Sequence, residues 1–113
     1  MPGFKYFKYF ERDNLADGAT YDDTWYPDTD IKIKRIYLAR KDGAAFTKST
    51  FYLKVKETVY THPVVPAAVL GPNVEISPEL NIPVAAKQVI AFSLKNLEGT
   101  AIGVMITLEC HEP

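Results

Sequence analysis

The stretch from Ile102 to Cys110, IGVMITLEC, carries an apolar side chain at every second position. Successive side chains of a β-strand point to opposite faces of the sheet, so a period of two predicts a strand with one face in a hydrophobic core. Branched residues at several of these positions also favour the extended conformation. We therefore expect a strand over residues 100–110 whose buried face consists of Ile102, Val104, Ile106, Leu108 and Cys110.

The same alternation predicts three further strands, over residues 31–39, 46–60 and 88–96. In the first of these the alternation slips by one residue at Arg35, as a β-bulge would allow. In the other two, the apolar residues of one parity define a single buried face. The predicted core of the protein accordingly contains Leu53, Val55, Phe92, Leu94, Val104 and Ile106.

Turn residues separate the predicted strands. Arg40-Lys41-Asp42-Gly43 and Asn96-Leu97-Glu98-Gly99 each place a glycine where a tight turn needs a positive φ, and both predict β-hairpins. Between them, five prolines from Pro63 to Pro83 predict an ordered connection with short edge strands near residues 64–70 and 75–82. Short strands joined by turns, without a long amphipathic helix, predict an all-β fold: a single antiparallel β-sandwich, jelly-roll-like.

The composition is that of one globular domain. The chain has 113 residues, of which 47% are hydrophobic and 24% charged, with a net charge of −1. This charge gives no reason to expect a nucleic acid or an anionic membrane as partner. No apolar run approaches the ~20 residues of a membrane span, and the N-terminal residues lack the layout of a signal peptide. Synthesis in a cytoplasm is the expected origin.

The charge is distributed unevenly along the chain. Residues 1–30 are mainly acidic, with seven acidic and three basic side chains, and residues 31–60 are mainly basic, with eight basic and two acidic ones. An acidic segment beside a basic one suits head-to-tail contacts between copies. Solvated strand faces are the alternative explanation.

Motifs for catalysis or metal binding are absent from the sequence. Cys110 excludes an internal disulfide because it has no partner, and it continues an apolar row, so we expect a buried thiol rather than a nucleophile paired with His62. His111 follows Cys110 directly, so the two should face opposite ways on a strand. We predict no catalytic residues, no metal ligands, no cofactor and no enzyme activity.

Six aspartates lie within 18 residues and make calcium a candidate ligand. Calcium prefers several oxygen ligands from loops, yet the stretch from Asp13 to Gly18 lacks the regular spacing of a calcium loop and its distal glutamate. Aspartates in loops more often hydrogen-bond to turns. We therefore expect turn caps at Asp13, Asp17, Asp22, Asp23, Asp28 and Asp30.

Aromatic residues concentrate in the first 26 positions, which hold eight of the fourteen. Residues 1–30 thus form either an aromatic and acidic arm or the first strands, beside a sandwich core at residues 31–113. In residues 4–10 both parities carry rings, so we expect them to be covered by protein, in part by another subunit. The alternative is a first strand held in its own sandwich, with Lys5 and Lys8 snorkelling. The predicted interface residues of this segment are Phe4, Tyr6, Phe7, Tyr9 and Phe10.

Two further sets of residues are candidates for binding. The face of the last strand opposite its apolar row is small and weakly polar, where solvated strands usually carry charges, and it adds Ala101, Gly103 and Met105 to the predicted oligomer interface. An alternative ligand-binding role uses Tyr21, Trp25 and Tyr26, since aromatic platforms near carboxylates suit sugar rings. That alternative makes the domain a carbohydrate-binding module, which we expect to be monomeric.

The closing stretch from Gln88 to Leu108, QVIAFSLKNLEGTAIGVMITL, resembles the last hairpin of small β-sandwich proteins encoded by phages and other viruses. The preceding order, a long strand over residues 51–60 and then a proline-rich apolar crossing, is similar to the single jelly rolls of virion structural proteins. The resemblance covers about residues 31–110. It implies a non-enzymatic capsid, cement or decoration subunit of a symmetric assembly, located in the virion, with copies of itself or other virion proteins as partners.

Overall fold

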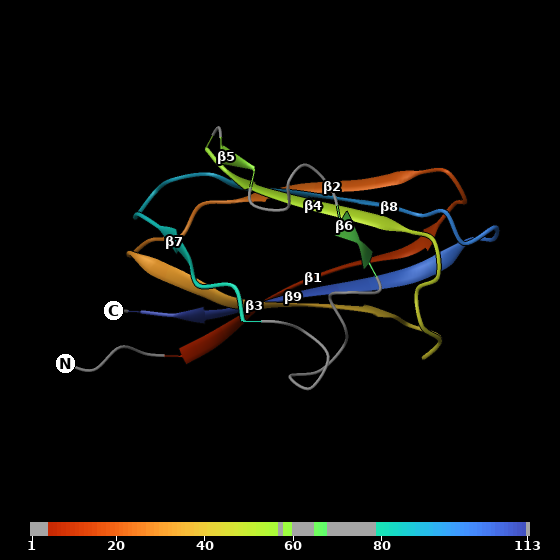
Figure 1. The fold of residues 1–113 in the computed structure, drawn as a ribbon, viewed down its shortest axis with the longest axis horizontal. Coiled ribbons are helices and arrows are strands. Elements are labelled where there is room, and N and C mark those ends of the chain that lie inside the picture. The colour runs from red at the N-terminus through yellow and green to blue at the C-terminus, as the bar shows by residue number, and fades with distance from the viewer. Residues whose placement is uncertain (1–4, 57, 60–64, 68–78, 113) are drawn as a thin grey trace.

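The computed structural model describes residues 5–56, 58–59, 65–67 and 79–112. These residues form strands and connections, without an α-helix among them, arranged as two layers packed face to face (Figure 1). The strands, in chain order, are β1 (Lys5–Leu15), β2 (Thr20–Trp25), β3 (Ile31–Arg40), β4 (Thr50–Val55), β5 (Thr58–Val59), β6 (Val65–Pro66), β7 (Ile82–Val84), β8 (Ile90–Lys95) and β9 (Ile102–His111).

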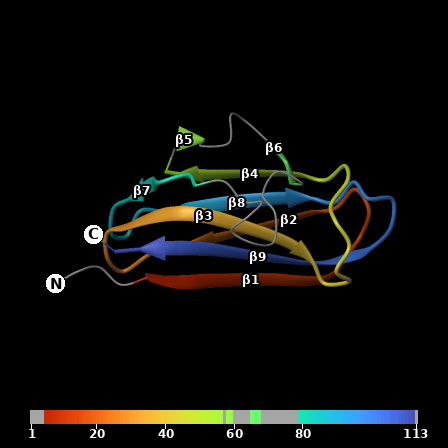
Figure 2. The same cartoon turned by 60° about the horizontal axis from the view of Figure 1, so that its bottom comes forward.

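The strands form two antiparallel sheets. Sheet A has the order β1-β9-β3-β7, and sheet B has the order β2-β8-β4-β5, with β6 also paired to β4. Figure 2 shows β1 as the outermost strand of its layer, next to β9. The prediction of an all-β antiparallel sandwich is confirmed.

The two predicted hairpins are wrong. β8 belongs to sheet B and β9 to sheet A, and the turn after β3 likewise leads from sheet A to β4 in sheet B. The turn chemistry itself is present, because Gly43 and Gly99 have φ values of 81° and 89°. The apolar faces of consecutive strands meet across the core instead of lying side by side, so each turn becomes an arch between the layers.

The predicted strands occur close to their predicted positions, with one subdivision. The segment expected over residues 46–60 is shorter, and divides into β4 and β5 at Lys56, whose φ is 54°. The expected slip at Arg35 is a register shift against β9 between Ile33 and Arg35. Of the proline-rich connection, β6 and β7 are edge strands, and Pro83 lies in β7 at the edge of sheet A, where a missing N–H is tolerated.

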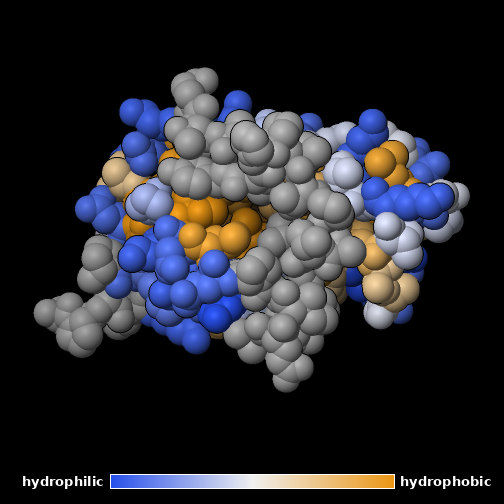
Figure 3. All heavy atoms as spheres, in the orientation of Figure 1, coloured by the Kyte–Doolittle hydropathy of each residue, from blue (hydrophilic) through white to orange (hydrophobic). Residues whose placement is uncertain are grey.

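The core lies between the two sheets and contains all six residues predicted for it: Leu53, Val55, Phe92, Leu94, Val104 and Ile106. Phe92 is at the centre of an aromatic cluster, with ring centroids 4.8 Å from Phe10, 5.5 Å from Tyr21 and 6.2 Å from Phe51. In Figure 3 apolar side chains are visible between the layers, with hydrophilic residues around them.

Residues 5–30 are part of this sandwich. β1 pairs with β9 along most of its length, and β2 pairs with β8. Leu15 and Tyr21 are both buried in the common core. Of the two alternatives for this segment, the structure has the first strands, one at the edge of each sheet.

Candidate functional site

Two predicted sets of interface residues come together on the outer face of sheet A. Tyr9 on β1 is in register with Thr107 on β9, which is in register with Tyr37 on β3. Phe7 lies one row away and Met105 lies in the other adjacent row. Phe7 is 56% exposed and Tyr9 48% exposed, although both are large and apolar. We call the surface made by Phe7, Tyr9, Tyr37, Met105 and Thr107 the outer aromatic face.

Both tyrosine hydroxyl groups on this face are bound to carboxylates of the same sheet. The Tyr9 hydroxyl donates to Glu11 Oε2 at 2.8 Å, and the Tyr37 hydroxyl donates to Glu109 Oε1 at 2.5 Å. The hydrogen bond to Glu11 raises the pKa of Tyr9, while burial and the bond to Glu109 raise the pKa of Tyr37. Both phenols therefore stay neutral at physiological pH, and the rings remain available for apolar contact.

A buried carboxylate lies beside one end of the outer aromatic face. Glu109 is only 4% exposed, and besides Tyr37 its carboxylate contacts His111 Nε2 at 2.8 Å and Arg35 Nη1 at 3.7 Å. Burial alone would raise the pKa of Glu109, but the hydrogen bonds from Tyr37 and His111 and the charges of Lys5 and Arg35 outweigh it and lower the pKa. The network holds Tyr37 and Arg35 in place.

The opposite end of the face is covered by a side chain of the same protein. Lys41 Nζ reaches Glu11 at 2.6 Å and Asp13 at 2.5 Å, from the β3 side of the sheet to β1. To do so its side chain passes over Gly103 on β9, which lies between them. The small residue at position 103 is thus explained by Lys41, and only the part of the face from Phe7 to Met105 stays open.

The other predicted aromatics of β1 point into the sandwich. Tyr6 and Phe10 are partly buried and pack against the core, and the Tyr6 ring lies edge-on to Trp25 at 6.4 Å. Lys8 Nζ lies over the rings of Phe10 and Trp25, 5.6 and 5.4 Å from their centroids. The structure therefore separates the predicted set: Phe7 and Tyr9 face outward, and Tyr6 and Phe10 face inward.

Two predicted interface positions, Phe4 and Ala101, remain to be placed. Phe4 is outside the described residues, so its position stays a prediction. Ala101 is exposed and precedes β9, at the end of the strand that Lys41 covers. Tyr37 and Glu109, in contrast, were missed from sequence. For Tyr37 the sequence signal was the slip of the alternation at Arg35, because after this slip the side chain of Tyr37 lies on the outer face of sheet A.

The three residues of the alternative ligand-binding site do not share an exposed surface. Tyr21 is buried against Phe92, with its hydroxyl 3.3 Å from Asp23. Trp25 is partly buried against the core, and Tyr26 alone is exposed, at 59%. A sugar-stacking platform made from these three rings is not assembled in this fold.

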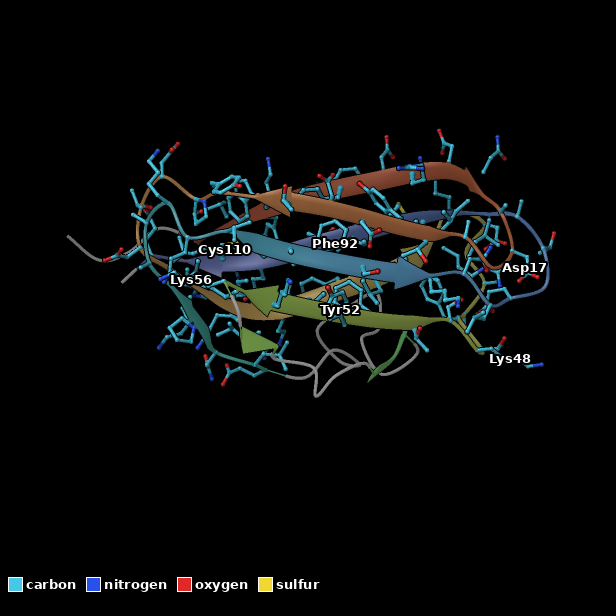
Figure 4. All side chains as sticks on the ribbon, turned by 90° about the horizontal axis from the view of Figure 1, so that it is seen from above. Asp17, Lys48, Tyr52, Lys56, Phe92 and Cys110 are labelled. Atoms are coloured by element: carbon cyan, nitrogen blue, oxygen red, sulfur yellow. The ribbon has the colours of Figure 1, made fainter. Side chains whose placement is uncertain are left out.

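A different depression is present on the outer face of sheet B. It has a volume of about 510 Å³ and is wide open, and Ala91 of the central strand β8 contributes to its lining. Asp22 and Thr24 line it from β2, and Tyr52 and Lys54 line it from β4. Figure 4 looks onto this side of the molecule, with Tyr52 labelled on β4 and Phe92 on β8. Asp23 and Phe92 complete the lining, so the depression combines aromatic residues with two acidic residues and one basic residue.

A polar cluster joins the loops at one end of the sandwich. The carboxylate of Glu98, with 2% side-chain exposure, accepts hydrogen bonds from the backbone N–H groups and hydroxyl groups of Thr47 and Ser49, from the N–H of Lys48, and from Arg40. Burial alone would raise its pKa, but these donors lower the pKa of Glu98 to about 2. With every donor supplied by its own chain, Glu98 is a structural carboxylate.

The aspartates bind other parts of the protein more than their own turns. Asp17 accepts the N–H of Gly99, and Asp30 accepts the N–H of Ala86. Asp28 pairs with Lys87, and Asp23, which lies within β2 and not in a turn, accepts the N–H of Thr24 and the hydroxyl of Tyr21. Several of these carboxylates therefore connect loops that are distant in sequence. No group of three or more metal-ligating side chains is found within the described part of the chain.

Two chemically reactive side chains, Cys110 and His111, are consecutive residues of β9 and point to opposite faces of its sheet. Cys110 is fully buried, and burial raises its pKa to about 12. His62 is outside the described residues, so its pairing with Cys110 stays untested, and His111 contacts Glu109.

Comparison with known proteins finds no family model that matches this chain and no curated protein with significant sequence similarity. A search of the described residues for a long apolar helix that could cross a membrane is also negative.

Proposed function

We propose that this protein is a non-enzymatic structural subunit that associates with copies of itself through the outer aromatic face, in the manner of a viral capsid, cement or decoration protein. The observation that carries the proposal is the exposure of Phe7 and Tyr9 beside Tyr37 and Met105. In a virion, such a subunit would contact other copies or neighbouring virion proteins.

The composition of this face supports protein–protein contact. Aromatic residues and methionine are enriched at interfaces, and charged residues are depleted from their centres and more frequent at their rims. On sheet A the rings of Phe7, Tyr9 and Tyr37 lie between a charged group around Glu109 and another around Lys41. An aromatic side chain buries about 150–250 Å² when fully covered; because Phe7 and Tyr9 are about half exposed, covering them contributes a part of an interface of about 800 Å² per partner.

We further propose that the sandwich is a jelly roll. Its pairings support this, since β1 pairs with β9, β2 with β8, β3 with β7 and β4 with β5. Such pairing of first with last, and second with second-to-last, describes a long antiparallel ribbon that is folded over into two sheets. Jelly rolls form viral capsid subunits and also lectin domains. The fold is thus compatible with both assembly and ligand binding, and the exposed aromatic face favours assembly.

The test is the mass of the protein in solution, measured by size-exclusion chromatography with light scattering and by native mass spectrometry. We expect a discrete oligomer that dissociates when Phe7 and Tyr9 are both changed to serine. Tyr26→Ser is the matched control, because Tyr26 is as exposed but lies outside the outer aromatic face. A wild-type protein that remains monomeric at every soluble concentration would refute the proposal.

A second candidate function is ligand binding in the depression of sheet B. It is favoured by the combination of Tyr52 with Asp22 and Lys54 around a shallow open space, which offers a ring and hydrogen-bonding groups to a small saccharide. Saturation-transfer NMR with a panel of oligosaccharides would detect this. Signals that vanish in Tyr52→Ala would support ligand binding, and a wild-type protein that gives none would dismiss it.

A further inference from the structure

We propose that the contact between copies is made by edge-to-edge pairing of β1 with β1 of a second copy, antiparallel about a two-fold axis at Lys8. This inference rests on the proposed function and places the contact at the β1 edge of the outer aromatic face, where Phe7 and Tyr9 lie, whereas Met105, Thr107 and Tyr37 lie further in on β9 and β3. It would extend sheet A of one copy directly into sheet A of the other.

β1 is a long strand at the edge of sheet A. It spans 11 residues, from Lys5 to Leu15, and within the described chain it is hydrogen-bonded in sheet A only to β9. Figure 2 shows it at the margin of its layer. A strand edge presents a row of N–H and C=O groups that can pair with another strand. Natural edge strands are often shortened, covered or charged; β1 carries five charged residues in 11, but its stretch from Tyr6 to Phe10 contains only one, Lys8.

The sequence of β1 favours one register for such a pairing. In a continuous antiparallel sheet, directly opposed residues lie on the same face, so a two-fold axis must pass through a residue position. With the axis at Lys8, Lys5 opposes Glu11, and Phe7 opposes Tyr9. Each of these pairs occurs twice, once on each side of the axis, and all four residues lie on the outer side of the sheet, where their side chains are exposed.

The inward side of β1 matches in the same register. Tyr6 opposes Phe10 of the second copy, and both rings are only partly buried by their own domain. Opposed aromatic pairs and opposed opposite charges each contribute about 0.2–1 kcal/mol relative to alanine pairs. Lys5 is paired to no carboxylate among the described residues, and Glu11, although bound to Lys41, remains 49% exposed at its side chain. Both are available to a second copy.

The neighbouring registers are poorer. An axis at Tyr9 opposes Phe7 with Glu11, and it pairs Lys5 with Asp13, which lies where the register of β1 with β9 shifts, between Arg12 and Leu15. An axis at Phe7 opposes Lys5 with Tyr9 and leaves Glu11 without a lysine. Only the axis at Lys8 pairs the apolar residues with each other and the charged residues with each other.

This register has one unfavourable contact, because Lys8 of one subunit lies opposite Lys8 of the second copy. Like charges directly opposite in a sheet are destabilising. The ammonium group of Lys8 lies over the rings of Phe10 and Trp25, which directs it away from the axis into its own sandwich. The contact therefore weakens the pairing without excluding it.

Cysteine scanning tests the register directly. Single cysteines are placed at Lys5, Phe7, Lys8, Tyr9 and Glu11, and disulfide formation between copies is followed under mild oxidation. Cys110 is fully buried, so it contributes no competing thiol. We expect Lys8→Cys to cross-link fastest, because only that position opposes itself, with Cβ atoms about 4.5–5.5 Å apart, against about 7–8 Å for the diagonal neighbours.

The outcomes of the scan separate this inference from the proposed function. Fastest cross-linking at Phe7→Cys or Tyr9→Cys would overturn the register, and an oligomer that persists with no cross-link at any position would overturn the edge pairing while leaving the proposed assembly role intact. A wild-type protein that is monomeric would defeat both.

A charge exchange provides an independent check. Lys5→Glu places two carboxylates opposite each other at both ends of the pairing, and we expect roughly tenfold weaker association, the equivalent of about 1.4 kcal/mol. The double variant Lys5→Glu/Glu11→Lys restores opposite charges and should recover most of the association. Failure of the double variant to improve on Lys5→Glu would contradict the pairing of these two positions.

Discussion

The side chain of Lys41 lies directly on Gly103, and a Cβ atom at position 103 would be 2.9 Å from Lys41 Cδ and 3.1 Å from its Cβ and Cγ. Real Cβ atoms essentially never approach other atoms below 3.0 Å, so any larger residue at position 103 must displace Lys41. Lys41 can therefore reach across β9 to Glu11 and Asp13 because residue 103 is a glycine.

The first prediction concerns Gly103→Val. The hydrogen bond from Lys41 lowers the pKa of Glu11 most, followed by the hydrogen bond from Tyr9. With Lys41 displaced, the pKa of Glu11 should rise toward its ordinary value of 4.5, as followed by NMR titration of the side-chain carboxyl. Lys41→Met should produce the same rise. An unchanged pKa of Glu11 in Gly103→Val would mean that Lys41 reaches its partners by another path.

The second prediction concerns acid stability. The pKa of Glu98 is lowered from 4.5 to about 2 in the folded protein, so the unfolded state takes up a proton first as the pH falls. The contribution of Glu98 is fully present above about pH 4.5 and is lost as the pH falls toward 2. Its size is about 3 kcal/mol, at about 1.4 kcal/mol per pKa unit. Urea unfolding between pH 6 and pH 2 measures it.

Glu98→Gln serves to isolate this carboxylate. The amide removes the charge and directs an NH₂ group at a ring of N–H and O–H donors, so we expect a loss of about 2–4 kcal/mol at pH 7 and a flatter dependence on pH. Glu79→Gln is the control, since Glu79 is exposed and bound only at the surface. Equal pH dependence in Glu98→Gln and wild type would show that another group governs acid unfolding.

The third prediction concerns the aromatic cluster that joins the sheets. Phe92 is 2% exposed, and its ring contacts Phe10 of sheet A as well as Tyr21 and Phe51 of sheet B. Phe92→Ala should destabilise the protein by about 3–5 kcal/mol, because it removes buried surface and leaves a cavity. Chemical denaturation gives the value. A loss below about 1 kcal/mol would be incompatible with a ring enclosed on all sides.

Strands and core were predictable because both depend on local periodicity. Phe92 and Val104 occupy positions whose parity alone determines which way they point, and no knowledge of the sheet partner is needed. The slip at Arg35 was visible for the same reason, since a bulge interrupts the alternation of one strand. The alternation in residues 31–110 was therefore sufficient to predict most of the strands and core residues of this part of the sandwich.

The pairing of strands was not predictable in this way. Gly99 permits a tight turn, yet it does not determine whether the following strand lies beside β8 or across the core from it. That choice depends on which arrangement buries both apolar faces, and it involves strands as distant as β1 and β9. The hairpin prediction failed at this point. Contacts such as that of Lys41 with Gly103 could not be predicted either, because they depend on how strands distant in sequence are paired.

The sequence predicted which strand carries the aromatic residues of the candidate site, but not which of them are exposed. The aromatic content of β1 indicated a surface that needs cover, but one strand with rings on both faces does not show which rings the domain covers itself. In the structure, Tyr6 and Phe10 belong to the core side, and Phe7 and Tyr9 remain outside. Tyr37 completes the outer aromatic face from β3, which is distant in sequence and could be placed only once β9 was found between the two strands.

The last prediction distinguishes two lysines of one strand. If β1 pairs with itself about Lys8, Lys8→Gln removes the only like-charged contact of the pairing and should tighten association severalfold, since such contacts are worth about 0.2–1 kcal/mol. Lys5→Gln removes an attraction to Glu11 and should weaken association by a similar factor. Both changes remove one positive charge, so a general effect of net charge would move the two variants in the same direction. Dissociation constants from sedimentation equilibrium, measured where circular dichroism shows both variants folded, provide the comparison.

The stability of the subunit provides a second readout. Because Lys8 also lies over Phe10 and Trp25, Lys8→Gln should lower the stability of each subunit while it strengthens the contact between them. A purely structural role of Lys8 does not produce this combination. Weaker association in Lys8→Gln would rule out a two-fold axis at this residue.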